Sequence, residues 1–243
     1  MLATVAPVDV HLARLVFLRA TLLADHAPVA HASQSTLAQA VHRAATATPA
    51  AAAASTTSTA AADALHVGAF LLPAGTARPN LHALAAAAPS LLHEIARAVT
   101  STAHTSSSNA SLASIAARVD ALVAPAGLVG AGSIARQPLP SGLGAQGQGA
   151  QATNSNSSDA WRLCHIAVLP ANRENGYGSN VVRALRRHVE TKDGKYMWST
   201  SDLDIFWETM GFEDAGAHPI DGTSQNVILT DIVKSFSCPS AFC

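Results

Sequence analysis

The sequence predicts an α/β (α+β) protein with a central mixed sheet flanked by helices, and three observations lead to this class. Strand-like and helix-like segments alternate from residue 161 to 233, which is the order that builds sheets covered by helices. A turn bearing two glycines, "LPANRENGYGSN" (169–180), joins the first of these strands to the first helix. At 243 residues, the chain is also long enough to bury one sizeable core.

Each element of this half has its own signal, either apolar periodicity or turn chemistry. The expected elements are a strand at 161–169, a helix at 178–190, a turn at Asp193-Gly194, a strand at 195–200, a helix at 202–210, and strands at 212–218 and 225–233.

The first half has a different composition and predicts fewer elements. Before residue 159 there is no lysine, and Phe17 and Phe70 are the only aromatic residues. Segments 45–64, 100–111 and 141–158 are rich in Ala, Ser, Thr, Gly or Gln and offer little large apolar surface, so we expect low-complexity insertions that stay flexible.

Between these insertions the sequence favours a helix at 81–99, kinked or split at Pro89, and a β-hairpin made of 120–125 and 128–137. Two segments compete for the start of the fold. We favour 10–25 as the first helix over 65–75 as the first element, which makes residues 33–118 largely an insertion. The expected division is an N-terminal region at 1–118, a domain core at 119–236 and a tail at 237–243.

Composition excludes several classes of partner. A net charge of −1 disfavours nucleic acid, and no apolar run reaches the roughly 20 residues of a membrane span. Cys164, Cys238 and Cys243 are few and lack metal-type spacing, which favours an intracellular, reducing compartment over secretion. Cytoplasm or an organelle such as a plastid both fit, because the N-terminus partly resembles a transit peptide. The scattered histidines of the first half, His66 among them, predict no metal site and are most simply solvated.

The glycine turn predicts an anion site. The first amides of a helix have no intrahelical acceptor, and the helix dipole favours negative charge there. Gly176 and Gly178 would let a pyrophosphate approach the backbone, with Arg173 beside the loop and Ser179 at the helix start. The same glycines could equally serve a turn and helix packing. There is neither a Gly-Lys-Ser/Thr triphosphate loop nor the full glycine set of the dinucleotide fingerprint.

Two motifs together resemble the Gcn5-related N-acetyltransferase (GNAT) superfamily. The first is "VLPANRENGYG", in which Val168, Pro170, Arg173, Gly176 and Gly178 match a strand ending in V-x-P followed by Arg/Gln-x-x-Gly-x-Gly/Ala. The second is "FWETMGF" (206–212), which matches Phe-Tyr-x-x-x-Gly-Phe except at its second position. The resemblance covers residues 120–234 well and the earlier chain poorly.

This resemblance implies a GNAT acyl-CoA N-acyltransferase fold, with its twisted sheet splayed in the middle and acetyl-coenzyme A between the strands at 161–169 and 195–200. The implied activity is transfer of an acetyl group to a primary amine by direct attack in a ternary complex, without a metal. The implied contacts are Ala167 and Val168 to the pantetheine arm, and Arg173, Glu174, Asn175, Gly176, Tyr177, Gly178 and Ser179 to the pyrophosphate. The partners are then acetyl-CoA and an amine acceptor, and a homodimer is left open.

The sequence departs from the family pattern at the groups that would move protons. Trp207 stands where many members carry a Tyr, and indole cannot protonate a thiolate. Arg162 stands where some relatives carry Glu. His165 is the nearest titrating group and the candidate catalytic base, although strict strand alternation leaves open which way it points. The alternative function is therefore a catalytically silent CoA-binding or interaction module.

Overall fold

The computed structural model describes residues 2–21, 64–72, 80–101, 108–140, 143, 159–202, 204–220 and 223–232. Its elements are β1 (Leu2–Pro7), α1 (Val10–Thr21), β2 (Ala64–Leu72), α4 (Leu81–Ser101), α5 (Ser108–Val123), the 3₁₀ turn η3 (Ala124–Ala126), β3 (Leu128–Arg136), β4 (Ala160–Val168), the 3₁₀ turn η6 (Pro170–Asn172), α6 (Tyr177–Thr191), β5 (Tyr196–Thr200), α7 (Ile205–Thr209), β6 (Glu213–Ile220) and β7 (Thr223–Asp231). No helix within these ranges is long and apolar enough to cross a membrane.

Seven strands form one sheet in the order β1-β2-β3-β4-β5-β7-β6. β4 and β5 run parallel, whereas the other neighbouring strands run antiparallel. The parallel pair is joined by α6, the crossover helix that such a connection needs. The predicted mixed sheet flanked by helices is therefore confirmed.

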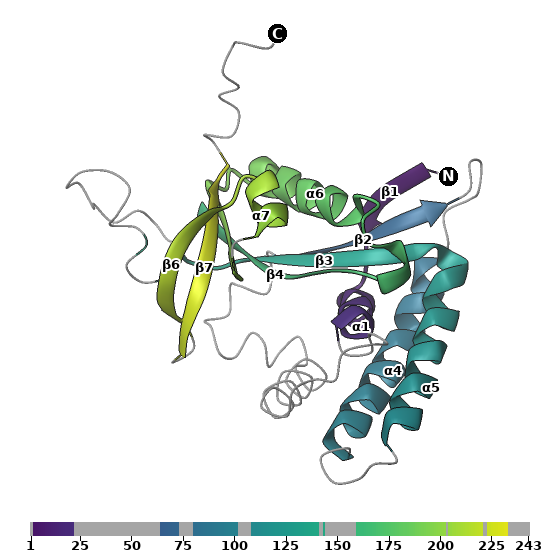
Figure 1. The fold of residues 1–243 in the computed structure, drawn as a ribbon. Coiled ribbons are helices and arrows are strands. Elements are labelled where there is room, and N and C mark those ends of the chain that lie inside the picture. Colours follow the sequence, from purple (N-terminus) through teal and green to yellow (C-terminus); the bar gives the residue numbers. More distant parts are fainter. Residues whose placement is uncertain are drawn as a thin grey trace, which may run out of the picture.

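Helices cover both faces of the sheet (Figure 1). α6 and α7 lie on one face, and α1, α4 and α5 lie on the other. Each face has its own hydrophobic core: Val181 and Leu185 of α6 pack in one, and Leu15 of α1 and Ile95 of α4 pack in the other. The sheet is thus the middle layer of three.

α6 shows why the predicted elements of the second half are close to the observed ones. Val181, Leu185 and Val189 are buried at helical spacing, while Arg183 and Arg187 are exposed. This apolar stripe identifies an amphipathic helix whatever surrounds it. The observed helix, Tyr177–Thr191, extends the expected 178–190 by one residue at each end.

The first half contributes far more to the fold than expected. β1 and β2 extend the sheet, and α4 and α5 form a helical pair on the face covered by α1. The expectation that residues 33–118 are largely an insertion is wrong, as is the hairpin of 120–125 and 128–137, because 108–123 is helix α5. The boundary expected between residues 118 and 119 falls inside that helix. Most of the low-complexity segments and the tail at 237–243 lie outside the described residues.

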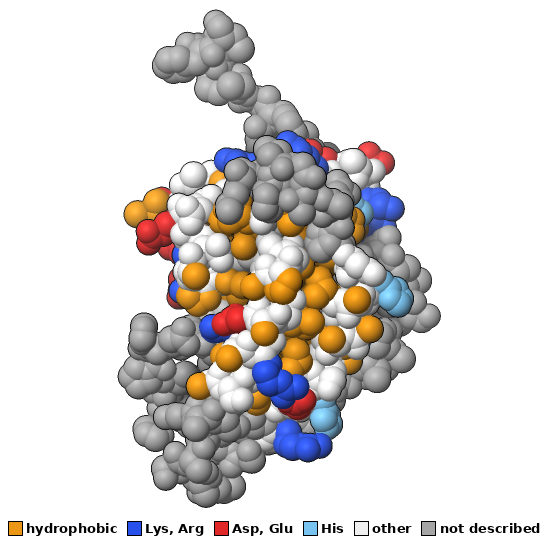
Figure 2. All heavy atoms as spheres, turned by 90° about the vertical axis from the view of Figure 1, so that its right-hand side faces the viewer, with side chains coloured by type: hydrophobic (Ala, Val, Ile, Leu, Met, Phe, Trp, Pro, Cys, Tyr) orange, Lys and Arg blue, Asp and Glu red, His pale blue; other side chains and the backbone are white. Residues whose placement is uncertain are grey.

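α4 is one helix with Pro89 inside it, so the expected helix forms and, of the two alternatives at Pro89, the split does not occur. Pro89 is exposed, as are Ala83 and Ala86 of the same helix and Ala117 and Ala121 of α5. Figure 2 looks at this side of the molecule and shows small hydrophobic side chains mixed with a few charged ones. Alanine at these exposed positions favours helix through its low conformational cost.

A partly buried ion pair joins α1 to α5. The Arg19 guanidinium donates from Nε and Nη2 to the two carboxylate oxygens of Asp120, at 2.9 and 2.8 Å. The residue Arg19 is 6% exposed, so this bidentate geometry compensates for the loss of its hydration. The pair fixes the helix that carries Arg14 and Phe17, both of which face the candidate site.

Close approach between β3 and α6 depends on a glycine. A Cβ built on Gly132 would lie 2.5 Å from Val181 Cγ1 and 3.1 Å from Leu185 Cδ1. Only a residue without a side chain lets α6 sit this near the sheet.

We expect Gly132→Ala to lower the free energy of unfolding by about 1–3 kcal/mol, because it overpacks this contact. Adding Val181→Ala removes the clashing methyl group, so the double variant should be less destabilised than the sum of the single changes. Urea denaturation of the four proteins measures this coupling. Additive losses would contradict the packing argument, and Ala117→Ser on exposed α5 is the control, expected within about 0.5 kcal/mol of the original.

Candidate functional site

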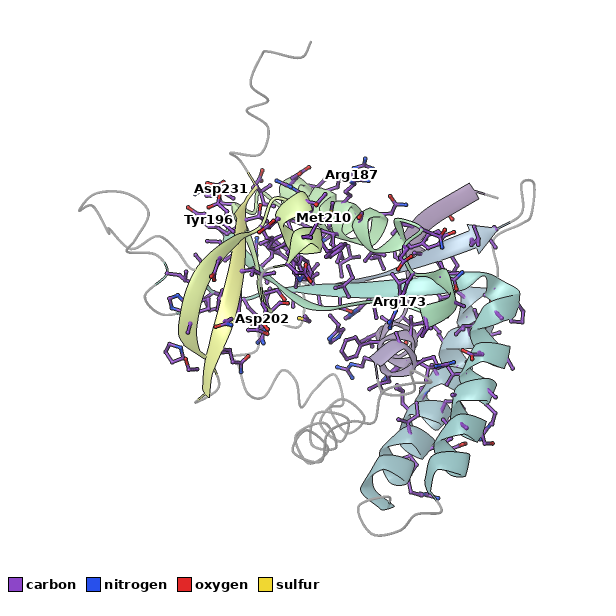
Figure 3. The ribbon with its side chains drawn as sticks, viewed as in Figure 1. Arg173, Arg187, Tyr196, Asp202, Met210 and Asp231 are labelled. Carbon is purple, nitrogen blue, oxygen red and sulfur yellow. The ribbon has the colours of Figure 1, made fainter. Side chains whose placement is uncertain are left out.

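The sheet forks between its two parallel strands. β4 and β5 pair only where Ala160–Arg162 lies beside Tyr196–Trp198, and the Ser199 hydroxyl then donates to the Leu163 carbonyl at 3.0 Å. Beyond this point β4 continues beside β3 and β5 continues beside β7. Figure 3 shows the separation, since Arg173 and Asp202, which follow the ends of the two strands, lie far apart.

An irregularity in β4 coincides with the fork. Ser133 of β3 pairs with His165, and the next residue, Ile134, pairs with Leu163, which leaves Cys164 as an extra residue. Such a bulge bends a strand and increases its twist. β4 therefore turns away from β5 directly after their last paired residues.

The bulge also decides the faces of β4, which alternation had left open. Leu163, Ile166 and Val168 pack in the core beneath α6, whereas Ala167 packs in the core beneath α1. His165 lies on the α1 face as well, with its ring centroid 5.1 Å from that of Phe17. Leu163 and His165 therefore lie on opposite faces, although strict alternation would place them on the same face, because Cys164 is an extra residue between them.

The loop after β4 ends in two left-handed residues. Glu174 has φ 66° and Gly176, the N-cap of α6, has φ 75°. The Asn175 side-chain amide braces the loop by donating to the carbonyls of Asn172 and Arg173, at 3.3 and 2.9 Å. A non-glycine residue held in this region is uncommon and points to a function for the loop.

The loop leaves a run of amides without protein acceptors. The Asn180 N–H makes the first hydrogen bond of the helix, to the Gly176 carbonyl at 3.1 Å. Within the part of the chain that the structure describes, the backbone N–H groups of residues 174–179 donate to no protein atom. Together with the positive end of the helix dipole, these donors form an anion-binding concavity.

Nothing fills the space in front of these amides at Gly176. A Cβ there would have no heavy atom within 4 Å, and one at Gly178 would lie 3.5 Å from the Phe206 ring and 3.7 Å from Val168 Cγ2. Tyr177 points the other way and is buried beneath α6. Protein packing alone would thus admit a methyl group at either glycine. The left-handed φ of 75° favours glycine at position 176, whereas no steric need within the chain accounts for Gly178.

Arg173 does not project freely into this loop. Its Nη2 donates to the carbonyl of Ala20 at 3.0 Å, and its Nε lies 3.4 Å from the carbonyl of Val168. In Figure 3 it lies between the end of β4 and α1. The positive charge stays beside the amides, while the guanidinium also binds the last turn of α1.

A row of polar residues crosses the α1 face of the sheet. His66 of β2 pairs with Ser133 of β3, which in turn pairs with His165 of β4. The His66 Nδ1 lies 2.8 Å from the Ser133 hydroxyl oxygen, and Ser133 is buried. The expectation that His66 is solvated is wrong, because the register of three strands brings it to His165.

Burial lowers the pKa of both histidines. Burial acts first and Arg14 second, and His66 adds to the effect on His165, whose pKa falls from 6.5 to about 4. His165 is therefore neutral near pH 7, and its conjugate acid is too strong an acid for an efficient general base at that pH. Neither Arg14 nor Ser133 belongs to a motif, so no local pattern could have identified them as part of this site.

Trp207 and Asp204 have structural roles. Trp207 is 7% exposed, and its ring lies edge-on to those of Phe206 and Phe212, with centroids 4.9 and 5.1 Å away. The Asp204 carboxylate caps α7 by accepting from the Trp207 N–H at 3.1 Å, as expected of an acid before a helix. Within the described ranges, no group of three or more His, Cys, Asp or Glu is placed to hold a metal ion.

Comparisons with known proteins find similar solved structures and no similar sequence. No protein-family model matches the sequence, and no curated protein matches it. Solved structures with a similar fold include a GNAT-family acetyltransferase from Desulfovibrio desulfuricans (12% identity, 95% of this chain and 99% of that chain, TM-score 0.44). Others are the PaiA N-acetyltransferase of Thermoplasma acidophilum in complex with coenzyme A (9% identity, 95% and 99%, TM-score 0.47) and a GCN5-related N-acetyltransferase from Kribbella flavida (11%, 94% and 97%, TM-score 0.41).

The lowered pKa of His165 makes stability depend on pH. Because the unfolded chain takes up this proton near pH 6.5 and the folded chain only near pH 4, the stability difference is complete above pH 6.5 and is lost as the pH falls toward 4. On acidification, the free energy of unfolding of His165→Gln should fall by about 2 kcal/mol less than that of the original protein. The figure is below the full value of the pKa shift because solvent reaches part of the His165 ring. Urea denaturation at pH 7, 5.5 and 4.5 measures the difference. An unchanged pH slope would contradict it, and exposed His82→Gln is the control.

Proposed function

We propose that this chain is a GNAT-type acyl-CoA-dependent N-acyltransferase that moves an acetyl group from acetyl-CoA to a primary amine. The observation that carries the proposal is the run of unbonded amides at 174–179, open at Gly176 and placed at the end of β4, beside the fork. A diphosphate matches this run in charge and in its number of acceptors. The two sequence motifs support the same assignment.

In this proposal the donor lies along β4. The amides of Glu174, Asn175, Gly176, Tyr177, Gly178 and Ser179 hold the pyrophosphate, with Arg173 adding positive charge from the α1 side. The backbone of Ala167 and Val168 runs toward the loop and pairs with the pantetheine arm. Because β5 has diverged at this level, the arm can take the place of a neighbouring strand, and its thioester comes to the fork near His165.

The reaction needs a neutral amine and a departing thiolate. The amine nitrogen attacks the thioester carbonyl, the C–N bond forms and the C–S bond breaks, and the proton lost by the amine balances the one gained by the thiolate. Arg14 is the charged side chain that lowers the pKa of His165 most, and such a cation also lowers the pKa of an ammonium bound beside it. The site thereby favours the reactive form, and orientation supplies much of the remaining catalysis.

The second candidate function, a silent CoA-binding module, is favoured by two observations. Trp207 is buried among aromatic rings and cannot donate a phenolic proton, and His165 is a weak base. A coenzyme A thiol can leave without an acid. A thiol-release assay with acetyl-CoA and a panel of small amines separates the two, because a silent module binds coenzyme A and releases no thiol above background.

Gly176→Glu tests the anion site directly. Its carboxylate would project into open space in front of the amides and repel the diphosphate, so we expect the dissociation constant for coenzyme A, measured by calorimetry, to rise at least about 100-fold. Gly216→Glu is a matched control, since Gly216 of β6 has φ 84°, has open space around it and lies outside the loop. Both variants carry the same backbone strain and charge. Equal affinity of the two variants, or no binding by the original protein, would refute the proposal.

A further inference from the structure

We propose that the acceptor is an amine that also carries a carboxylate, as an α-amino acid does, and that Arg162 binds that carboxylate. This inference rests on the proposed function and names the acceptor class for the same site. It follows from the position of Arg162, from how its guanidinium is held, and from the charges on the α1 face of the sheet.

Arg162 stands at the point of the fork. It is the last residue of β4 that pairs with β5, opposite Trp198. The strands separate directly after it, so its side chain lies where a thioester held between them would end. An acceptor must reach the same point, because its nitrogen forms a bond to the thioester carbon.

The Arg162 guanidinium is held in place and still has N–H groups that can donate to another partner. Its central carbon lies 5.1 Å from the centre of the Trp198 ring, and Nη1 makes one long hydrogen bond of 3.5 Å to Gln137 Oε1. Stacking on an aromatic ring fixes the position of the planar group and leaves its N–H edge for a bidentate partner. A carboxylate fits that edge with two parallel hydrogen bonds.

No acid among the residues that the structure describes takes this place. Across the described ranges, Arg162 forms no ion pair, although its residue is half-buried. A half-buried cation is stabilised when a counter-charge reaches it. Arg162 differs in this respect from Arg19, whose counter-charge is the carboxylate of Asp120.

The permanent charges that act on His165 are positive. They belong to Arg14 and Arg162, because the lowered pKa of His66 leaves that ring neutral near pH 7. Asp9 is an acid that acts on Arg14 and His66. Asp202, beyond the end of β5, accepts from the Asn226 side chain at 2.5 Å. A cationic field of this kind attracts a carboxylate and repels polyamines and lysine-rich peptides.

The test compares acceptors that differ only in the carboxylate: L-phenylalanine with phenethylamine, and L-tyrosine with tyramine. For the original protein we expect kcat/KM to favour each amino acid by at least about tenfold, the value of one charged hydrogen bond. Arg162→Gln should lower kcat/KM for the amino acids about 10- to 100-fold, mostly through KM, and leave the amines within about twofold. Arg162→Lys keeps the positive charge but loses the planar guanidinium with its paired N–H donors. Its kcat/KM for the amino acids should lie between those of the original protein and of Arg162→Gln.

Arg187→Gln is the matched control, because it removes one positive charge from the exposed surface of α6, on the other face of the sheet (Figure 3). It should leave the acceptor preference unchanged. Thermal unfolding and calorimetry with coenzyme A accompany every variant, and Arg162→Gln should keep the original affinity for coenzyme A. Calorimetry of the amino acid into the coenzyme A complex gives a readout without turnover.

The outcomes separate this inference from the function on which it rests. Absence of coenzyme A binding to the original protein overturns both. Intact coenzyme A binding with turnover of at least one amine overturns the acceptor class alone if phenethylamine, tyramine or spermidine is the better acceptor, if neither amino acid is acetylated, or if Arg162→Gln leaves the preference unchanged. Intact binding with no turnover of any acceptor overturns the transferase function as well.

Discussion

One extra residue in β4 determines the geometry on which the rest of the site depends. Cys164 interrupts the pairing with β3 at the level where β4 leaves β5. A regular strand would keep its side chains in strict alternation between the two faces. The bulge instead turns His165 toward α1 and opens the edge of β4, so a local backbone irregularity produces both the space for an arm and the polar surface beside it.

In the proposed function, the two faces of the sheet have different roles, one in binding the donor and the other in binding the acceptor. The amides before α6, open at Gly176, suit the highly charged end of a donor, while the row from His66 to His165 lies beneath α1 on the opposite face. Trp207 and its aromatic neighbours fill the α7 side and add no chemistry. In the proposed function, acceptor chemistry then falls to the α1 face, whose cationic groups would favour a neutral nitrogen and a nearby anion.

Elements that depend on a local sequence pattern could be predicted, whereas contacts that depend on the register between strands could not. α6 was predictable because its apolar stripe and its glycine N-cap are both local signals. α5 was missed because "DALVAP" looks like a strand when read alone, whereas the alanine-rich residues before it continue as helix. His66 was dismissed because it is more than 60 residues from its partner Ser133. Bulges leave no such signal, so the direction of His165 could not be derived.

Arg173 connects the loop to the helix on the other side of the sheet. Its bond to the Ala20 carbonyl means that the residue beside the amides also completes the last turn of α1, the helix that places Phe17 on His165. An anion that drew Arg173 toward itself would release that turn, and a molecule seated against α1 would in return alter how strongly the anion is held. Occupancy of the two sides would then be thermodynamically linked, with equal effect in both directions.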